Sequence, residues 1–206
     1  MKVDFKSDFP VTDAACKTAT GRTLKDWFTA LEARGETLSR RDSINWMNGE
    51  MKAKDFWWST TVWVEFERGR GIVNKKDGLI EGYNICVTKT INAGLKDVYS
   101  AFVKPTELVK WFGAGTTATV KDGGQFKDQD GNYGEFLRVR TDKDLRFTWK
   151  GQKSDSTTQV DIAFADKGKG KSGITLTHNR IQTRAEADGL RTAWGAAFDR
   201  LKAQLE

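Results

Sequence analysis

Apolar residues recur at helical spacing along the first third of the chain. Residues 23–35 (TLKDWFTALEARG) place apolar side chains on one helical face, between a threonine suited to begin a helix and a glycine suited to end it. Residues 39–51 and 53–71 repeat this spacing, the former behind a capping serine. Together with a short leading helix over residues 13–18, the pattern predicts four helices in a small helical bundle.

From residue 83 the spacing changes to that of strands. Residues 83–91 (YNICVTKTI) alternate apolar and polar side chains, and residues 92–113 then carry two short helices, the second beginning at a proline. Five or six strands are predicted next, joined by glycine-containing turns, over 116–121, 124–128, 132–140, 145–150, 157–165 and 172–179. Residues 183–206 close the chain as a helix with one long apolar face.

This order of elements predicts an α+β fold in two domains. The stretch between Gly69 and Gly82 is rich in glycine and charge and poor in apolar anchors, so we place the domain boundary there. The predicted domains are a helical module over 1–75 and a β-α-α-β6-α domain over 82–206, whose antiparallel sheet wraps around the long C-terminal helix.

The composition narrows the class of protein. The 206-residue chain is 38% hydrophobic and 30% charged, which is typical of a soluble globular protein. No stretch is long and apolar enough to cross a membrane, and the acids near the N-terminus argue against a secretion signal. Cys16 and Cys86 lie far apart without metal-ligand spacing. We expect a cytoplasmic protein with reduced thiols, no membrane contact, no metal and no cofactor.

The net charge of +6 is spread evenly along the chain. Residues 1–76 hold 14 Lys and Arg against 11 Asp and Glu, and residues 77–206 hold 20 against 17, so each part carries +3. Neither part contains a run of five or six like charges. No phosphate-binding stripe is therefore indicated, and we do not expect a nucleic-acid partner.

Residues 165–172 (ADKGKGKS) look like a phosphate-binding loop, because the stretch ends in glycine, lysine and serine. Such a loop needs a helix directly after it, since the helix N-terminus and the loop amides hold the phosphates. The residues that follow, GITLTHN, alternate as a strand does. We therefore interpret the stretch as a solvated hairpin turn and not as a nucleotide site.

Two sets of stretches resemble known families. KTINAGLKDVYSAFVKPTELVKWFG, GNYGEFLRVRTDKDLRFTWKG, GITLTH and GLRTAWGAAFDRLKAQLE occur in this order over roughly 83–206. They resemble the SRPBCC superfamily of helix-grip proteins, in the branch similar to the C-terminal domain of the activator of heat-shock protein 90 ATPase. TGRTLKDWFTALEARG and FWWSTTVWVEFERGRG resemble a helical module of unknown function found ahead of such domains in bacterial proteins. The resemblance implies a fold but no single activity, because the superfamily includes lipid carriers, receptors, cyclases and chaperone activators.

In the helix-grip fold that the resemblance implies, the curved sheet and the last helix enclose an apolar cavity or a filled core. Ten residues are candidates to line it: Trp111, Phe112, Phe126, Phe147, Trp149, Ile162, Phe164, His178, Trp194 and Phe198. The sidedness rests on strand alternation, which places Phe147 and Trp149 on one face. These side chains either fill the core or border a pocket for an apolar or aromatic ligand.

His178 is the only histidine and lies in phase with Ile174 and Leu176, so we expect it to face the cavity. There it is a hydrogen-bonded structural residue, or the polar group that orients a ligand, or a general base. One histidine and scattered carboxylates make neither a metal cluster nor a catalytic triad.

Two roles are open for the tryptophans of the helical module. Trp57, Trp58 and Trp63 either fill the core of the module or present an aromatic patch to a partner. Because adjacent side chains of a helix cannot face the same side, one of Trp57 and Trp58 should meet the other domain or solvent.

Three functions remain open. The first is a non-enzymatic binding protein with an apolar or aromatic cavity for a small hydrophobic ligand. The second is a protein-interaction or chaperone-ATPase-regulating module, and the third is an enzyme acting on a small aromatic or lipid-like substrate. The lack of a clustered acid–base set counts against the enzyme. A void on the concave side would favour the first function, and a solid core the second. The sequence leaves the ligand, the protein partner and the oligomeric state open.

Overall fold

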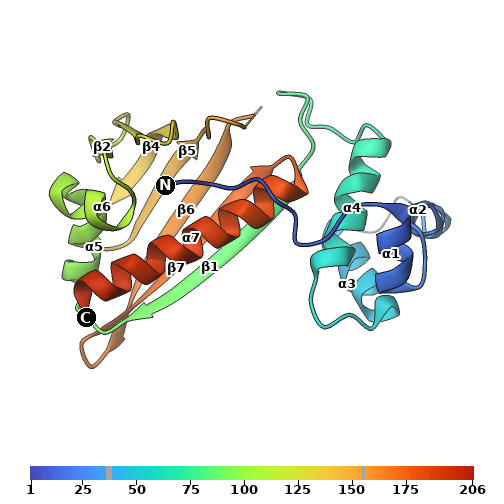
Figure 1. Cartoon of the computed structure of the whole chain (residues 1–206), viewed down its shortest axis with the longest axis horizontal. Coiled ribbons are helices and arrows are strands. Elements are labelled where there is room, and N and C mark those ends of the chain that lie inside the picture. The colour runs from blue at the N-terminus through green and yellow to red at the C-terminus, as the bar shows by residue number, and fades with distance from the viewer. Residues whose placement is uncertain (36–38, 155) are drawn as a thin grey trace. The chain divides into compact units, whose positions relative to one another are not determined.

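The computed structural model describes residues 1–35, 39–154 and 156–206 (Figure 1). The described residues form two compact units. The helical unit comprises Ser7–Tyr83 and Gln182–Ala185, and the sheet unit comprises Met1–Lys6, Asn84–Ile181 and Glu186–Glu206. The first six residues therefore pack with the sheet unit, although they lie in the sequence ahead of the helices.

The helical unit contains four helices among its described residues: α1 (Asp13–Thr20), α2 (Leu24–Ala33), α3 (Arg40–Met51) and α4 (Trp57–Gly69). Side chains cap the first three. Thr23 accepts from the main-chain nitrogen of Asp26, whose carboxylate accepts from the main-chain nitrogen of Thr23 in return, a reciprocal capping box. Ser39 caps α3 in the same position, as its sequence context predicts.

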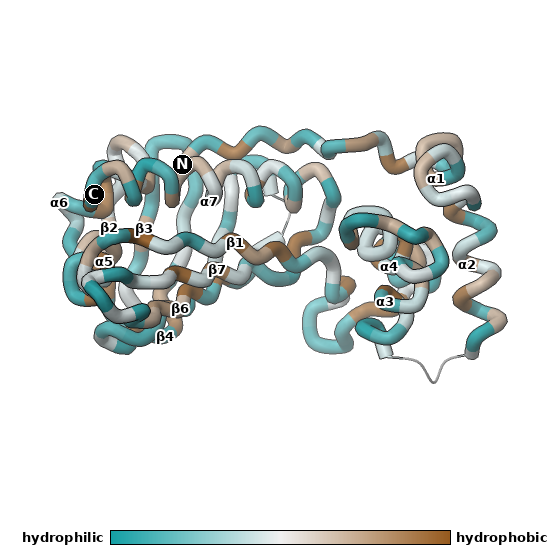
Figure 2. Tube along the Cα trace, turned by 90° about the horizontal axis from the view of Figure 1, so that it is seen from below, coloured by the Kyte–Doolittle hydropathy of each residue, from teal (hydrophilic) through white to brown (hydrophobic). Residues whose placement is uncertain are grey.

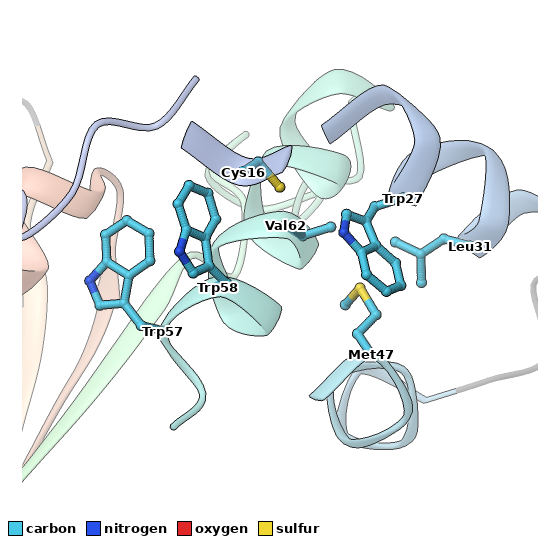
Figure 3. Packing of buried hydrophobic residues seen from close by; sticks show 7 residues of the cluster. All are labelled: Cys16, Trp27, Leu31, Met47, Trp57, Trp58 and Val62. Carbon is cyan, nitrogen blue, oxygen red and sulfur yellow. The ribbon is translucent and has the colours of Figure 1, made fainter. Parts of the chain in front are cut away.

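Buried side chains from all four helices fill the helical unit. Figure 3 shows Trp27, Leu31, Met47 and Val62 pointing toward one another, with Trp58 beside Cys16. Trp57 and Trp58 are both buried, so neither faces solvent. The ring of Phe9 lies 5.2 Å from that of Trp57, and the Arg184 guanidinium lies 4.3 Å from it. Residues from outside α4 thus pack against the ring of Trp57.

The sheet unit follows the predicted order of elements: β1 (Tyr83–Ile91), α5 (Leu95–Val103), α6 (Pro105–Trp111), β2 (Thr117–Ala118), β3 (Gln125–Lys127), β4 (Tyr133–Arg140), β5 (Asp144–Trp149), β6 (Thr158–Gly168), β7 (Lys171–Ile181) and α7 (Arg184–Leu205). The seven strands form one sheet in the order β1-β7-β6-β5-β4-β3-β2. Figure 1 shows α7 lying across the sheet, with α5 and α6 at one end of it. The predicted α+β helix-grip fold is confirmed.

Strand register sets which side chains face α7. Phe136 lies opposite Phe147, which lies opposite Val160, which in turn lies opposite His178. All four residues are buried, so one row of the inner face crosses β4, β5, β6 and β7. Because successive strand residues face opposite sides, the residues between them form the outer face.

The glycine- and lysine-rich stretch is a hairpin turn between β6 and β7, as predicted. Gly168, Lys169 and Gly170 all have positive φ, which glycine tolerates best and which suits the twist of a tight hairpin. Ser172, however, does not belong to the solvated turn. It is fully buried in β7, and its hydroxyl donates to the carbonyl of Ala93 at 2.8 Å. No helix follows, which leaves no phosphate site here.

Candidate functional site

All ten predicted residues are buried between the sheet and its helices. Trp111 and Phe112 come from the end of α6, five come from strands β3, β5 and β6, His178 comes from β7, and Trp194 and Phe198 come from α7. The alternation of the strands and the apolar face of α7 bring these side chains to one side of the sheet.

The aromatic rings pack edge to face in one continuous cluster. The ring of Phe112 lies 5.9 Å from that of Phe126, 6.0 Å from that of Trp149 and 5.8 Å from that of Trp194. Trp149 and Trp194 lie 5.4 Å apart. Rings at these distances attract one another beyond the gain from burial, so the cluster is a well-packed core.

A cavity of about 20 Å³ remains inside this cluster. Six of the ten predicted residues line it: Trp111, Phe112, Phe126, Phe147, Ile162 and Trp194. The four that do not line it are Trp149, Phe164, His178 and Phe198. This volume is about that of one water molecule, and an apolar lining keeps such a void dry. In this conformation the core has no room for a small hydrophobic ligand.

Four further residues line the cavity, and the sequence reasoning did not assign them to it: Phe102, Leu108, Phe136 and Leu145. Helical spacing places Phe102 on the apolar face of α5, and strand alternation places Leu145 on the same face as Phe147. Periodicity places such residues on the inner face. It does not say which inner-face residues border a void, because that depends on how α5, α6, α7 and the sheet pack together.

His178 is fully buried and both of its ring nitrogens are hydrogen-bonded. The indole nitrogen of Trp194 donates to His178 Nδ1 at 3.2 Å. The Thr158 hydroxyl donates to the carbonyl of Trp149 at 3.0 Å, so its oxygen accepts from His178 Nε2 at 2.7 Å. A nitrogen that accepts from an indole carries no proton, which makes the imidazole neutral with its proton on Nε2. Burial lowers the pKa of His178 to about 3.

These contacts tie the end of β5, β6, β7 and α7 together through one polar chain in an apolar core. Every polar atom of the chain has a partner, so the buried group costs little stability. His178 Nε2–H and Nδ1 both point at protein atoms, which leaves neither nitrogen directed at the cavity.

The outer face of the sheet presents a different surface. Tyr133 and Leu137 on β4 are among the large apolar side chains that the described chain exposes, at 55% and 45%. Tyr133 lies in a row with Lys127 on β3 and with Lys150, which directly follows β5. A shallow hollow of about 700 Å³ runs over this row and is lined mainly by threonines, lysines and Tyr133.

Arginines and aspartates extend this outer face along β4, β5 and β6. Arg138 and Arg140 both donate to Asp144, at 2.9 Å and 3.0 Å from their Nε atoms. Arg146 donates to Asp161 at 2.5 Å. The guanidinium of Arg140, together with that of Arg138, holds the pKa of the Asp144 carboxyl below its usual value. Three arginines thus share two carboxylates, which leaves the group with an excess positive charge.

Residues 1–35, 39–154 and 156–206 contain no group of three or more metal-ligating side chains of the His, Cys, Asp and Glu types. Within the same ranges, no helix has the length and hydropathy needed to cross a membrane.

Comparisons with known proteins agree on the sheet unit. The family model described as Activator of Hsp90 ATPase homolog 1-like protein matches residues 92–206. PFC0360w, an HSP90 activator from Plasmodium falciparum, is 18% identical with a TM-score of 0.56, over 60% of this chain and 96% of that one. CalU16 from Micromonospora echinospora is 20% identical with a TM-score of 0.54, over 60% and 76%.

The Aha1 dimer from Colwellia psychrerythraea is 19% identical with a TM-score of 0.53, over 60% of this chain and 96% of that one. A search of curated protein sequences finds no significant match. Structural likeness at such low identity establishes a shared fold and leaves activity open.

Proposed function

Since the chain belongs to the family of Activator of Hsp90 ATPase homolog 1-like proteins, which is matched over residues 92–206, we propose that it is a protein-binding module that regulates a chaperone ATPase of the Hsp90 type. The filled core carries this proposal: a cavity of about 20 Å³ leaves no space for a carried ligand. A helix-grip domain with a solid core acts through its surface. The structural similarity to PFC0360w, an HSP90 activator, makes this class of ATPase the first candidate partner.

The outer face of β3, β4 and β5 is the surface we assign to the partner. Tyr133 and Leu137 offer exposed apolar area, and tyrosine and arginine are the side chains most enriched at energetically important interface positions. Arg138, Arg140 and Arg146 supply excess positive charge beside them. Charge complementarity therefore fits a partner that presents an acidic protein surface around an apolar patch.

The test measures ATP turnover by a purified Hsp90-type ATPase from the same cells as the protein is added. Turnover is expected to rise and saturate, and the concentration for half-saturation is expected to increase with ionic strength because the contact is electrostatically assisted. Tyr133→Ser should raise that concentration by about tenfold or more, as loss of an interface tyrosine does. Turnover that stays at its basal rate at every concentration would refute the proposal.

Ile72→Ser is the matched control. Ile72 is 49% exposed and lies in the helical unit, so its substitution removes a comparable apolar side chain from a surface not assigned to the partner. It should leave both the maximum stimulation and the half-saturation concentration unchanged. Equal effects of the two substitutions would reject the outer sheet face as the docking surface.

Binding of a small apolar ligand is the second candidate function. One observation favours it: a cleft of about 320 Å³ on the sheet unit reaches down to Trp149, whose ring packs against the aromatic cluster. A movement that joined this cleft to the core would create room for a ligand, and the experiment on the N-terminal segment described next tests whether such a movement occurs.

A further inference from the structure

Residues Met1–Lys6 lie on the sheet unit as an extended segment, which we call the strap. The apolar residues Met1, Val3 and Phe5 are buried or half-buried, whereas the charged residues between them are exposed. Figure 2 shows the same alternation along the segment as it runs beside α7. A period of two is that of an extended chain with one face on an apolar surface. The strap is therefore held by its side chains as well as by its backbone.

Two glycines make room for the strap. A Cβ at Gly189 on α7 would lie 2.1 Å from the carbonyl oxygen of Asp4, and a Cβ at Gly113 after α6 would lie 2.7 Å from the main-chain nitrogen of Met1. Such distances are far inside van der Waals contact, so the strap and any larger residue exclude each other at both places. The closest approach of the strap to α7 depends on the absence of a side chain at Gly189.

Polar contacts hold the far end of the strap on the turn between β3 and β4. Asn132 Nδ2 donates to the carbonyl of Met1 at 2.6 Å and to the Asp128 carboxylate at 2.8 Å. The nitrogen of Met1 also pairs with Asp128, which is buried. These buried hydrogen bonds stabilise the Met1 end of the strap in its seated position. The strap thus spans from α7 to the turn that follows Phe126, a residue of the cavity lining.

The cleft of about 320 Å³ lies directly along the strap. Lys2, Val3 and Phe5 form one side of it, and the turns at 129–132 and 151–153 form the other. Its floor is Trp149, whose ring lies 5.7 Å from Phe126 and 5.4 Å from Trp194. One indole therefore separates the cleft, which the strap borders on one side, from the aromatic cluster that holds the small cavity.

We propose that the strap is the gate of the aromatic core: seated, it keeps the core closed, and when it lifts, a small apolar molecule enters from the cleft past Trp149. The strap residues, Gly189 and the cleft share no residue with the outer-face hollow around Tyr133. Experiments can therefore refute gating of the core without refuting partner binding on the outer face, and the reverse.

Gly189→Ala in the full chain tests the proposal. The added methyl group pushes the strap off α7, so binding of phenylnaphthylamine, a neutral apolar fluorescent probe, should become several-fold tighter than in the wild type. Gly195→Ala is the matched control, because Gly195 lies on the same helix and a Cβ there meets nothing within 4 Å. Both changes raise helix propensity equally, so a difference between them comes from the strap. Equal probe binding by both variants overturns the proposal.

A second pair of variants leaves α7 unchanged. Val3→Ser combined with Phe5→Ser removes apolar side chains from the strap, and Asp4→Ser combined with Lys6→Ser changes only exposed side chains that do not line the cleft. The first pair should bind the probe several-fold more tightly and exchange the amide hydrogens of the strap faster, and the second pair should do neither. Faster exchange without tighter probe binding would mean that the strap anchors the unit but does not gate it, which overturns the proposal.

Val62→Ala tests whether a general loss of stability, and not movement of the strap, increases probe binding. Val62 is fully buried in the helical unit, so its truncation destabilises the protein away from the strap. Probe binding by this variant should stay at the wild-type level under conditions where it remains folded. If Val62→Ala increases probe binding as much as Gly189→Ala does, the probe reports instability and the gate is rejected.

Discussion

The imidazole of His178 lies at the centre of the sheet unit among aromatic rings. The ring centroids of Trp149 and Trp194 lie 5.9 Å and 6.4 Å from it. Its charged form would be buried without a counter-ion within this cluster, whereas its neutral form satisfies both ring nitrogens. The pKa of about 3 follows from the cost of burying the charge.

This neutrality predicts a dependence of stability on pH. As the pH falls below 6.5, His178 takes up a proton in the unfolded chain, but in the folded protein only near pH 3. The unfolded state therefore binds more protons between these values, and the free energy of unfolding should fall with decreasing pH by about 1.4 kcal/mol per unit more than in a variant without this group. Denaturant titrations of wild type and His178→Gln between pH 6 and pH 4 give the difference.

Glutamine is the suitable replacement because its amide can accept from Trp194 and donate to Thr158, while it does not titrate. Carboxylates elsewhere contribute to both proteins and cancel in the comparison. Parallel pH profiles of the two proteins would mean that His178 gains its proton in the folded state as readily as in the unfolded one.

At the scale of elements, the first two residues of β7, directly after the hairpin turn, differ in solvent exposure. Lys171 is exposed and lies next to the turn, whereas Ser172 is fully buried and bonded to Ala93. Strand alternation accounts for this difference, because successive residues of β7 face opposite sides of the sheet. The hydroxyl links β7 to the segment between β1 and α5, so a polar residue in the interior has a structural role.

Ser172→Ala should lower the free energy of unfolding by about 1 kcal/mol, since it leaves the Ala93 carbonyl without its donor. Lys171→Ala is the control and should change the free energy of unfolding by less than about 0.5 kcal/mol, as exposed substitutions do. Thermal or denaturant unfolding of both variants measures the difference. A loss at Lys171 as large as that at Ser172 would contradict the burial pattern of β7.

At the scale of the whole molecule, the segment between the end of α4 and Ile80 lies near the end of the helical unit, shortly before the chain passes into the sheet unit after Tyr83. Residues 68–78 are all exposed, and local turn hydrogen bonds hold Asn74, Lys76 and Leu79. Few contacts cross such a segment, which is the property of a domain boundary. The proposed division into residues 1–75 and 82–206 depends on this segment.

Trypsin should cut first at Lys75 or Lys76, because proteases require an exposed backbone that can leave its local structure. Time-resolved digestion followed by mass spectrometry identifies the first products. Helix α7 also carries exposed basic residues, including Arg191 and Arg200. It serves as an internal control, because these side chains are accessible to trypsin while their backbone is held in a helix. A first cut within 95–112 or 184–205 would contradict a boundary between Gly69 and Gly82.

The sequence by itself determined the type and order of the elements of this protein. Hydrophobic spacing is a local property, so the period of two over 83–91 and the long apolar face of 183–206 predicted β1 and α7 within a residue at each end. The capping residues Thr23 and Ser39 act within one helical turn, so the sequence also predicted them. The resemblance supplied the way these elements close into a helix-grip fold.

Tertiary structure alone decided what the interior can hold. His178 acquires its tautomer from Trp194 and Thr158, which lie 16 and 20 residues away in the sequence on other elements. The cavity is small because side chains from α5, α6, α7 and the sheet interdigitate. How closely they fit depends on the distances between these elements in the folded protein, which the spacing of apolar residues along the sequence does not determine. The place of Met1–Lys6 on the sheet unit depends on Gly189, far along the chain, so only the folded molecule brings the strap and its seat together.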